Sequence, residues 1–154
     1  MERKTRMHAE DGKQEIIVTR EFELPLELLF KAYEDPAIVE QWMGTKVLKL
    51  DNKQHGGYQF ETTVNGNVVF RANGTIHAFV PNHKITRTFE MENTPFPVQI
   101  EFLEFEKLTE STSKLTMQIV YKSIEVRNQM LKLPFAQGLN MAHNILQETL
   151  DKLK

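Results

Sequence analysis

The sequence predicts an α+β fold in which a curved antiparallel β-sheet wraps around one long C-terminal α-helix. Apolar residues alternate with polar ones from about residue 46 to residue 122, which is the period of β-strands. From Pro134 onward they recur every three or four residues, which is the period of a helix. Two shorter stretches of helical spacing follow the first strand. A sheet that is long relative to its helices must curl to cover its apolar face, and the final helix is the natural cover.

The first third of the chain predicts one strand and two short helices. Residues 16–22 are rich in β-branched side chains and are bounded by polar ones, as in a strand. Pro25 suits the first turn of a helix, where no amide hydrogen bond is needed. Asp35 can then cap a second helix that begins with Pro36 and ends near Gly44.

Turn signals divide the alternating region into strands. Asn65-Gly66 is a strong hairpin turn, because both residues accept the positive φ angles that it needs. Pro81-Asn82 ends a long strand, and a loop interrupted by proline covers residues 93–97. We expect strands over residues 47–50, 58–64, 68–80, 85–91, 98–105 and 115–121.

The segment 98–105 has apolar side chains on both faces. Ile100 and Phe102 belong to one face, whereas Leu103 and Phe105 belong to the other. Either both faces are covered there, or a β-bulge switches the register.

The C-terminal third predicts a short helical segment and one long helix. Ser123 can cap the segment 124–131, and Pro134 opens the long helix. Gly138 lies on the apolar side of the long helix, where a glycine costs roughly 1 kcal/mol relative to alanine. We therefore expect a packing reason for it, either a close approach to the sheet or space for something else. The apolar stripe of the long helix is formed by Phe135, Leu139, Ala142, Leu146, Leu150 and Leu153.

Length and composition limit the possible functions. The 154 residues predict a single domain over residues 14–154, preceded by a flexible segment over residues 1–13. The absence of cysteine excludes disulfides, thiolate metal sites and a cysteine nucleophile, and it fits a reducing, cytoplasmic location. The chain has 19 Lys and Arg residues and 21 Asp and Glu residues, so its net charge is -2. This balance argues against nucleic-acid binding. No stretch approaches the ~20 apolar residues of a membrane span, so we expect no membrane partner.

The first residues are locally basic, with Arg3, Lys4, Arg6 and Lys13. They form either an electrostatic arm for an acidic partner or a solvated, frayed terminus. If these residues form a frayed terminus, the segment 1–13 is flexible.

No catalytic or cofactor-binding motif is recognisable in the sequence. The histidines at positions 8, 55, 77, 83 and 143 form no His-x-x-x-His pair, so we expect no metal. The serines lie in turns, without the Gly-x-Ser-x-Gly motif of hydrolases. Neither a phosphate-binding loop nor a dinucleotide fingerprint occurs, so we expect no cofactor.

Charged side chains on the strands have two interpretations each. Glu101, Glu104 and Glu106 form either a solvated sheet face or a set of carboxylates for acid–base chemistry. Without a bulge, Glu104 shares a face with Phe102. Arg87 alternates with apolar residues, so it belongs either to a pocket or to a rim from which its charge reaches water.

Aromatic residues from different segments form the other notable feature, with Phe 10, Tyr 3 and Trp 1 in the chain. They either line a ligand cavity, with few polar groups to anchor the ligand, or fill an ordinary core.

A series of short motifs occurs in one order along residues 15–153. A strand is followed by Pro-x-x-x-x-Phe-x-Ala, Asp-Pro and Trp-x-Gly, formed by Pro25, Phe30, Ala32, Asp35, Pro36, Trp42 and Gly44. The series continues with His55-Gly56-Gly57-Tyr58, Gly74-Thr75-Ile76, Pro81-Asn82-His83-Lys84-Ile85, Ser123-x-Glu125-x-Arg127 and Phe135-x-x-Gly138-x-Asn140. In this order and spacing, the motifs resemble the START-like, helix-grip superfamily (SRPBCC). Within it, they are similar to the branch of the heat-shock-protein ATPase activator homologues and the calicheamicin self-resistance protein.

The resemblance implies a helix-grip fold, like that of the birch pollen allergen, with an apolar cavity under the last helix. It implies a small hydrophobic or aromatic molecule as the ligand, and a monomer or a homodimer. Met43 and Pro134 depart from the family's pattern and change the cavity rim. The residues expected to line the cavity are Trp42, Phe60, Phe70, Ile76, Arg87, Phe89, Phe102, Met117, Phe135, Gly138, Leu139 and Ala142.

Members of the superfamily include co-chaperones, polyketide cyclase relatives, resistance proteins and many bacterial proteins of unknown role. We therefore keep two alternatives to ligand binding. A cyclase- or hydrolase-like enzyme would need a polar residue such as Arg87, His77 or Glu104 inside the cavity, next to the substrate. A co-chaperone-like interaction module would need a large exposed apolar patch.

Overall fold

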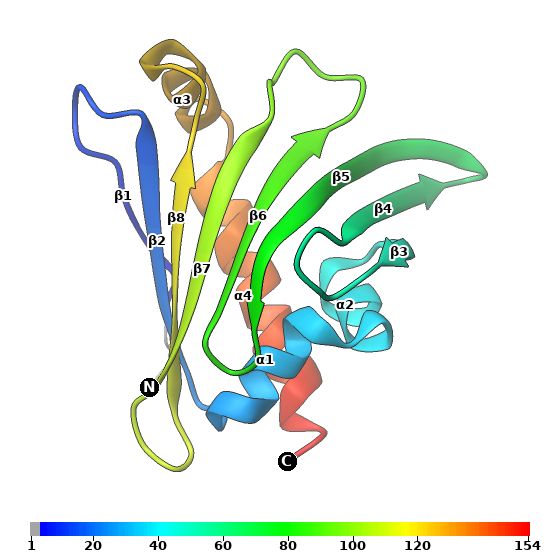
Figure 1. Cartoon of the computed structure of the whole chain (residues 1–154), viewed down its shortest axis with the longest axis vertical. Helices are drawn as coiled ribbons and strands as arrows, with labels where there is room; N and C mark the ends of the chain where they lie inside the picture. The colour runs from blue at the N-terminus through cyan, green and yellow to red at the C-terminus, as the bar shows by residue number, and fades with distance from the viewer. Residues whose placement is uncertain (1–3) are drawn as a thin grey trace.

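The computed structural model describes residues 4–154, in which four α-helices accompany one eight-stranded antiparallel sheet (Figure 1). The strands are β1 (Arg6–His8), β2 (Glu15–Phe22), β3 (Lys46–Leu50), β4 (Gly57–Val64), β5 (Asn67–Val80), β6 (Lys84–Met91), β7 (Gln99–Lys107) and β8 (Ser113–Val120). The helices are α1 (Leu26–Glu34), α2 (Pro36–Met43), α3 (Ile124–Leu131) and α4 (Phe135–Asp151). The sheet order is β1-β2-β8-β7-β6-β5-β4-β3, and all neighbours are antiparallel. The predicted α+β fold is confirmed.

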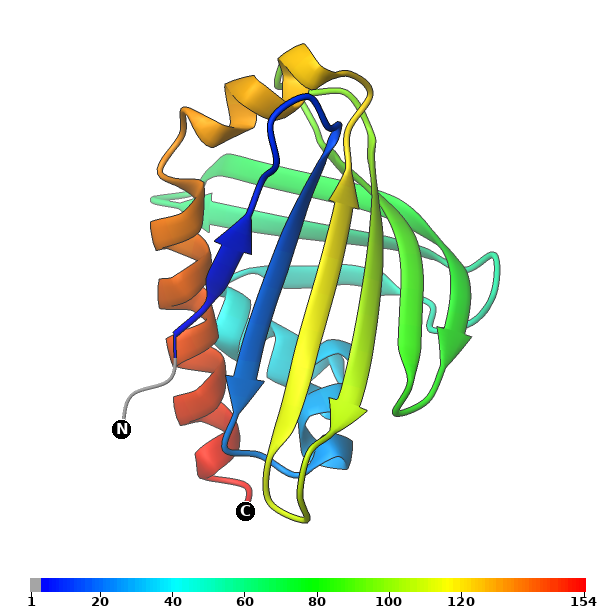
Figure 2. The same ribbon diagram turned by 90° about the vertical axis from the view of Figure 1, so that its left-hand side faces the viewer.

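The sheet curves around α4 (Figures 1 and 2). We call the concave face, against which the helices pack, the inner face, and the opposite face the outer face. Near the C-terminal end of α4, α1 and α2 also cover the inner face, whereas α3 lies at the other end of the sheet, between β8 and α4. The core therefore lies between the inner face, α1, α2 and the C-terminal half of α4.

The helix boundaries follow from the residues that the sequence singled out. The side chain of Asp35 accepts a hydrogen bond from the amide of Ala37, at 2.9 Å, and Pro36 takes the first position of α2. Gly44 ends α2 in the left-handed conformation, with φ 63°. Ser123 caps α3 by accepting a hydrogen bond from the amide of Val126.

Turns and bulges give the sheet its shape. Asn65 and Gly66 both have positive φ, 54° and 80°, as the predicted β4–β5 hairpin requires. The pairing of β5 with β6 shifts between Ile76 and Ala78, so His77 lies in a β-bulge, where its side chain is exposed. Such bulges increase the local twist and help the sheet to curve.

The register of β7 decides which of its side chains face the core. Its pairing with β6 and β8 is continuous, without a bulge. Glu101, Leu103 and Phe105 are buried on the inner face, whereas Ile100 and Phe102 lie on the outer face. The expectation that Phe102 belongs to the ligand-facing side is therefore wrong. Phe102 is paired laterally with Thr86 and Gln118 and remains 37% exposed.

The sheet begins earlier than the sequence indicated. β1 lies within the segment 1–13, which was expected to be flexible, and it pairs with β2. Residues 1–3 of that segment, including Arg3, lie outside the described residues. The backbone amide of Thr5 donates to Asn140 Oδ1 at 2.9 Å, and Thr5 Oγ1 lies 2.6 Å from His143 Nδ1. These contacts join the residue before β1 to α4, and Figure 2 shows β1 running beside this helix.

Among residues 4–154, no helix has the length and apolar character that crossing a bilayer would require.

Candidate functional site

The two halves of α4 cover the inner face unequally. In the C-terminal half, Leu146 and Leu150 are fully buried. In the N-terminal half, Phe135, Leu139 and Ala142 pack against the core but remain only partly buried. A Cβ atom added to Gly138 would meet nothing within 4 Å. The apolar side chains of the first turns of α4 are therefore covered less completely than those of its last turns.

A buried ion pair lies on the inner face of the two central strands β6 and β7. Arg87 is directly opposite Glu101 in the register, and Arg87 Nε donates to Glu101 Oε1 at 2.9 Å. The two side chains are only 10% and 6% exposed. The other oxygen, Glu101 Oε2, accepts a hydrogen bond from Gln99 Nε2, also at 2.9 Å. The arrangement places a neutralised charge pair within an otherwise apolar surface.

Tyrosines surround this pair. The guanidinium of Arg87 lies over the ring of Tyr58, 5.1 Å from its centre. Burial raises the pKa of both Tyr33 and Tyr58 above the ordinary tyrosine value, with an opposing effect of Arg87 and a smaller raising effect of Glu101. Burial and the charge of Glu101 raise the pKa of Tyr121 as well. All three phenols are therefore neutral hydrogen-bond donors at physiological pH.

The charge pair also keeps Arg87 ionised. Burial by itself lowers the pKa of Arg87, but the interactions with Tyr58 and Glu101, including the hydrogen bond to Glu101, outweigh it and raise the pKa overall. Arg87 therefore remains a cation, and a source of N–H donors, over the whole physiological range.

Most of the residues predicted to line a cavity lie in the core or at its edge. Trp42, Phe60, Ile76, Arg87 and Met117 are buried. Phe89, Phe135, Leu139 and Ala142 are partly buried and pack against the core. Phe70 is partly buried as well but does not belong to the set that packs against the core. Trp42 is held tightly, because its Nε1 donates to the carbonyl of Ala32 at 2.7 Å and its ring contacts Tyr33 edge-on.

Three residues considered for a site lie elsewhere. Phe102 and Glu104 are both exposed on the outer face of β7, and His77 is exposed in the bulge of β5. Gly138 is exposed as well, one helical turn from Phe135 and Ala142. The structure thus leaves Arg87 as the one polar member of the predicted set on the inner face.

Gln99 and Tyr121 were not predicted as site residues, and Glu101 was considered only in a set of carboxylates with Glu104 and Glu106. Because Ile100 and Phe102 are apolar, Phe102 was predicted to line the cavity, which assigned the wrong face of β7 to the core. A usable signal existed, because a charge such as Arg87 on an apolar face requires an opposite charge nearby. The glutamate directly across the strand pair is Glu101.

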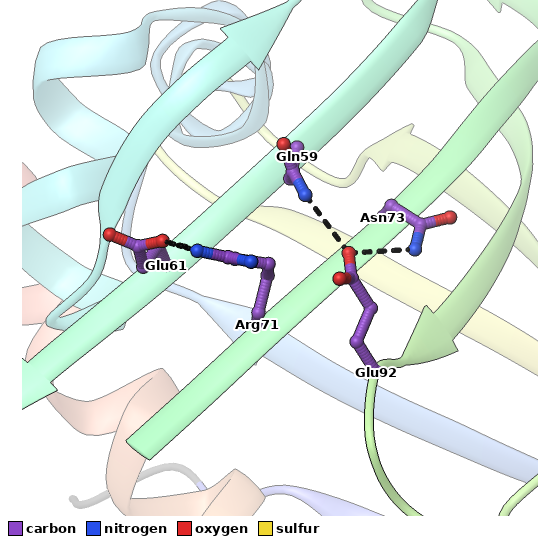
Figure 3. Close-up of polar contacts among 5 residues, drawn as sticks. All are labelled: Gln59, Glu61, Arg71, Asn73 and Glu92. Carbon is purple, nitrogen blue, oxygen red and sulfur yellow. Dashed lines mark hydrogen bonds and ion pairs between the residues drawn. The ribbon is translucent and has the colours of Figure 1, made fainter. Parts of the chain in front are cut away.

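A second polar group lies on the outer face of β4 and β5 (Figure 3). Arg71 forms an ion pair with Glu61. Glu92 Oε2 accepts hydrogen bonds from Asn73 Nδ2 at 2.9 Å and from Gln59 Nε2 at 3.0 Å. These bonds from Asn73 and Gln59 lower the pKa of Glu92. Because its charged and amide groups satisfy one another, we assign this group a structural role.

Residues 4–154 contain no cluster of three or more His, Asp or Glu side chains that could hold a metal ion.

Comparison with known proteins supports the fold at the level of a family. A family model described as "Activator of Hsp90 ATPase homolog 1-like protein" matches residues 23–151. No functionally curated protein matches the chain.

Several solved structures share the architecture at low sequence identity. Protein Ms6760 from Mycobacterium smegmatis superposes with a TM-score of 0.82 at 21% identity, over 94% of this chain and 95% of that protein. A protein from Rhodobacter sphaeroides gives a TM-score of 0.84 at 16% identity, with coverage of 96% and 99%. A protein from Arthrobacter aurescens gives 0.84 at 14% identity, with coverage of 96% and 91%. At these identities the similarity establishes the helix-grip fold alone.

Proposed function

We propose a ligand-binding function for this chain, which belongs to the family of activator of Hsp90 ATPase homolog 1-like proteins and has the helix-grip fold of SRPBCC proteins. The proposed ligand is a small hydrophobic or aromatic molecule. It binds between the inner face of the sheet and the N-terminal half of α4.

The proposal depends on one observation, the uneven packing of α4. Leu146 and Leu150 are completely buried, whereas Phe135, Leu139 and Ala142 keep part of their apolar surface uncovered. Removal of apolar surface from water is favourable by roughly 25 cal/mol for each Å2. A ligand that covers these side chains would gain this free energy. The apolar stripe continues over the whole helix, so burial by a bound molecule would complete it.

The two alternatives have less support. Of the polar residues that an enzyme could use inside the site, His77 and Glu104 are exposed, and the carboxylate nearest to Arg87, Glu101, already bonds Arg87 and Gln99. An interaction module would need a broad apolar patch. The three most exposed valines among the described residues, Val64, Val68 and Val69, are confined to the β4–β5 hairpin.

Titration with the neutral apolar probe N-phenyl-1-naphthylamine tests the proposal. The wild-type chain is expected to bind one probe molecule saturably, with the rise in probe fluorescence that follows transfer from water. Gly138→Leu is expected to weaken binding at least tenfold, because the leucine side chain would compete with the ligand for the partly uncovered apolar surface one helical turn away, at Phe135 and Ala142. An external probe is preferable to the fluorescence of Trp42. This residue of α2 is buried against α1, so it would report on ligands only indirectly.

Gln137→Leu is the matched control, because it adds the same side chain at the neighbouring, exposed position of α4. It should leave probe affinity within about twofold of the wild type. Absence of saturable binding to the wild type, or equal binding by a folded Gly138→Leu variant, would contradict the proposed function.

A further inference from the structure

Two hydrogen-bond donors on the inner face have no protein partner. Arg87 uses only its Nε–H for the bond to Glu101, and within residues 4–154 its two Nη groups donate to no acceptor. The hydroxyl of Tyr121 is buried and likewise has no hydrogen-bond partner among the described residues. Buried polar groups in folded proteins are nearly always satisfied, so the Tyr121 hydroxyl requires an explanation, whereas the Arg87 Nη groups are not fully buried and remain accessible.

The strand order places the two donors near each other. Tyr121 follows β8 directly and belongs to the same face as Met117 and Ile119. β7, which carries Glu101, lies between β8 and β6, and neighbouring strands are about 4.8 Å apart. Arg87 lies directly across from Glu101 on β6. Tyr121 lies two residues beyond Ile119, which is opposite Glu101 on β8, so the two donors are on opposite sides of β7. This end of the sheet, where β7 begins and β8 ends, is the one nearest to the start of α4 (Figure 1).

The charge balance indicates which chemical group fits these donors. Glu101 already neutralises Arg87, and Gln99 occupies the second carboxylate oxygen. A ligand carboxylate would add an uncompensated negative charge beside Glu101, and a ligand ammonium would lie beside Arg87. Either arrangement is expensive in a buried environment. A neutral oxygen acceptor receives hydrogen bonds from the donors without adding charge.

We infer that the ligand is a neutral, largely aromatic molecule with a carbonyl-type oxygen that accepts hydrogen bonds from the Arg87 Nη groups or the Tyr121 hydroxyl. Its apolar body lies against Phe135, Leu139 and Ala142. This inference rests on the proposed function and adds the chemical class of the ligand.

Three naphthalene probes of similar size test the inference by equilibrium dialysis. They are 2-acetylnaphthalene, which has a carbonyl acceptor, 2-ethylnaphthalene, which has none, and the anion 2-naphthoate. We expect the wild type to prefer the ketone to the ethyl compound by about tenfold, the value of one hydrogen bond to a charged donor. The naphthoate should bind more weakly than the ketone.

Two variants identify the donors. Tyr121→Phe removes only an unpartnered hydroxyl, so it should melt at or above the wild-type temperature and show a reduced preference for the ketone. Arg87→Met combined with Glu101→Leu removes both charges together and should also reduce that preference. Tyr58→Phe is the control, because the Tyr58 hydroxyl already donates to the carbonyl of Thr88 and its loss should leave the preference unchanged.

The outcomes separate this inference from the proposed function. Equal binding of the ketone and the ethyl compound by the wild type overturns the neutral-acceptor inference while the ligand site stands. Tighter binding of the naphthoate overturns it as well, as does a ketone preference that survives both variants. If none of the probes binds, the proposed function fails and this inference fails with it.

Discussion

Replacement of Glu101 by leucine would leave a buried cation without its counter-charge. Glu101 is 6% exposed on its side chain, and it is the only ion-pair partner of Arg87 among residues 4–154. Removal of one member of a buried pair typically costs about 3–5 kcal/mol, because the remaining charge is neither paired nor hydrated. The amide of Gln99 also loses its acceptor, which adds about 1 kcal/mol. Since small domains are stable by only about 5–15 kcal/mol, Glu101→Leu should be severely destabilised.

Urea unfolding followed by far-UV circular dichroism measures this loss. Glu104→Leu is the matched control, because it makes the same substitution on the same strand but on the exposed outer face. It should stay within about 0.5 kcal/mol of the wild type. In the double variant Arg87→Met with Glu101→Leu, no charge remains, so most of the lost stability should return.

The double-mutant cycle therefore predicts a coupling free energy of several kcal/mol between Arg87 and Glu101. A Glu101→Leu variant as stable as Glu104→Leu would show that water reaches the pair. Additive losses in the double variant would show that the two charges do not depend on each other.

Three further changes test the packing and the electrostatics. Leu146→Asp places an unpaired charge at a fully buried position, so it should lower the free energy of unfolding by several kcal/mol or unfold the chain. An unchanged melting temperature would mean that this side of α4 does not face the core. Gly74→Ala would place a Cβ 2.0 Å from the carbonyl oxygen of Thr88 and 2.6 Å from the Tyr58 hydroxyl, so we expect unfolding at a lower urea concentration. A urea midpoint equal to that of the wild type would contradict this close approach. Burial, assisted by the charge of Arg20, lowers the pKa of His143 from 6.5 to about 3, so the unfolded chain binds one more proton than the native chain between these values. Stability should therefore be full above pH 6.5 and fall on acidification by up to about 1.4 kcal/mol per pH unit, and an NMR titration that places the His143 pKa near 6.5 would contradict this.

The fold could be predicted from the sequence because its local signals agree with one another. Asp35-Pro36 and Ser123 start helices, Asn65-Gly66 turns a hairpin, and the stripe through Leu146 and Leu150 faces the core, all as expected. Each of these signals acts within a few residues, where the backbone or one side chain fixes the outcome.

The candidate site was less predictable because it depends on pairing between strands. In β7, Ile100 and Phe102 compete with Leu103 and Phe105 for the inner face, and periodicity alone gives both faces similar weight. The charge on Arg87 settles the choice, since it is satisfied only when Glu101 points inward. β1 was missed for a related reason: its order depends on pairing with β2 and on contacts of Thr5 with Asn140, far away in the sequence.

The most direct test of ligand binding under α4 is the position of a bound probe, measured by intermolecular nuclear Overhauser effects in methyl-labelled protein. With 2-acetylnaphthalene, we predict contacts to the methyl groups of Leu139 and Ala142 on α4 and of Ile76 on the inner face of β5. Contacts confined to outer-face methyl groups such as that of Ile100, or to Val68 on the β4–β5 hairpin, would contradict binding between the sheet and α4.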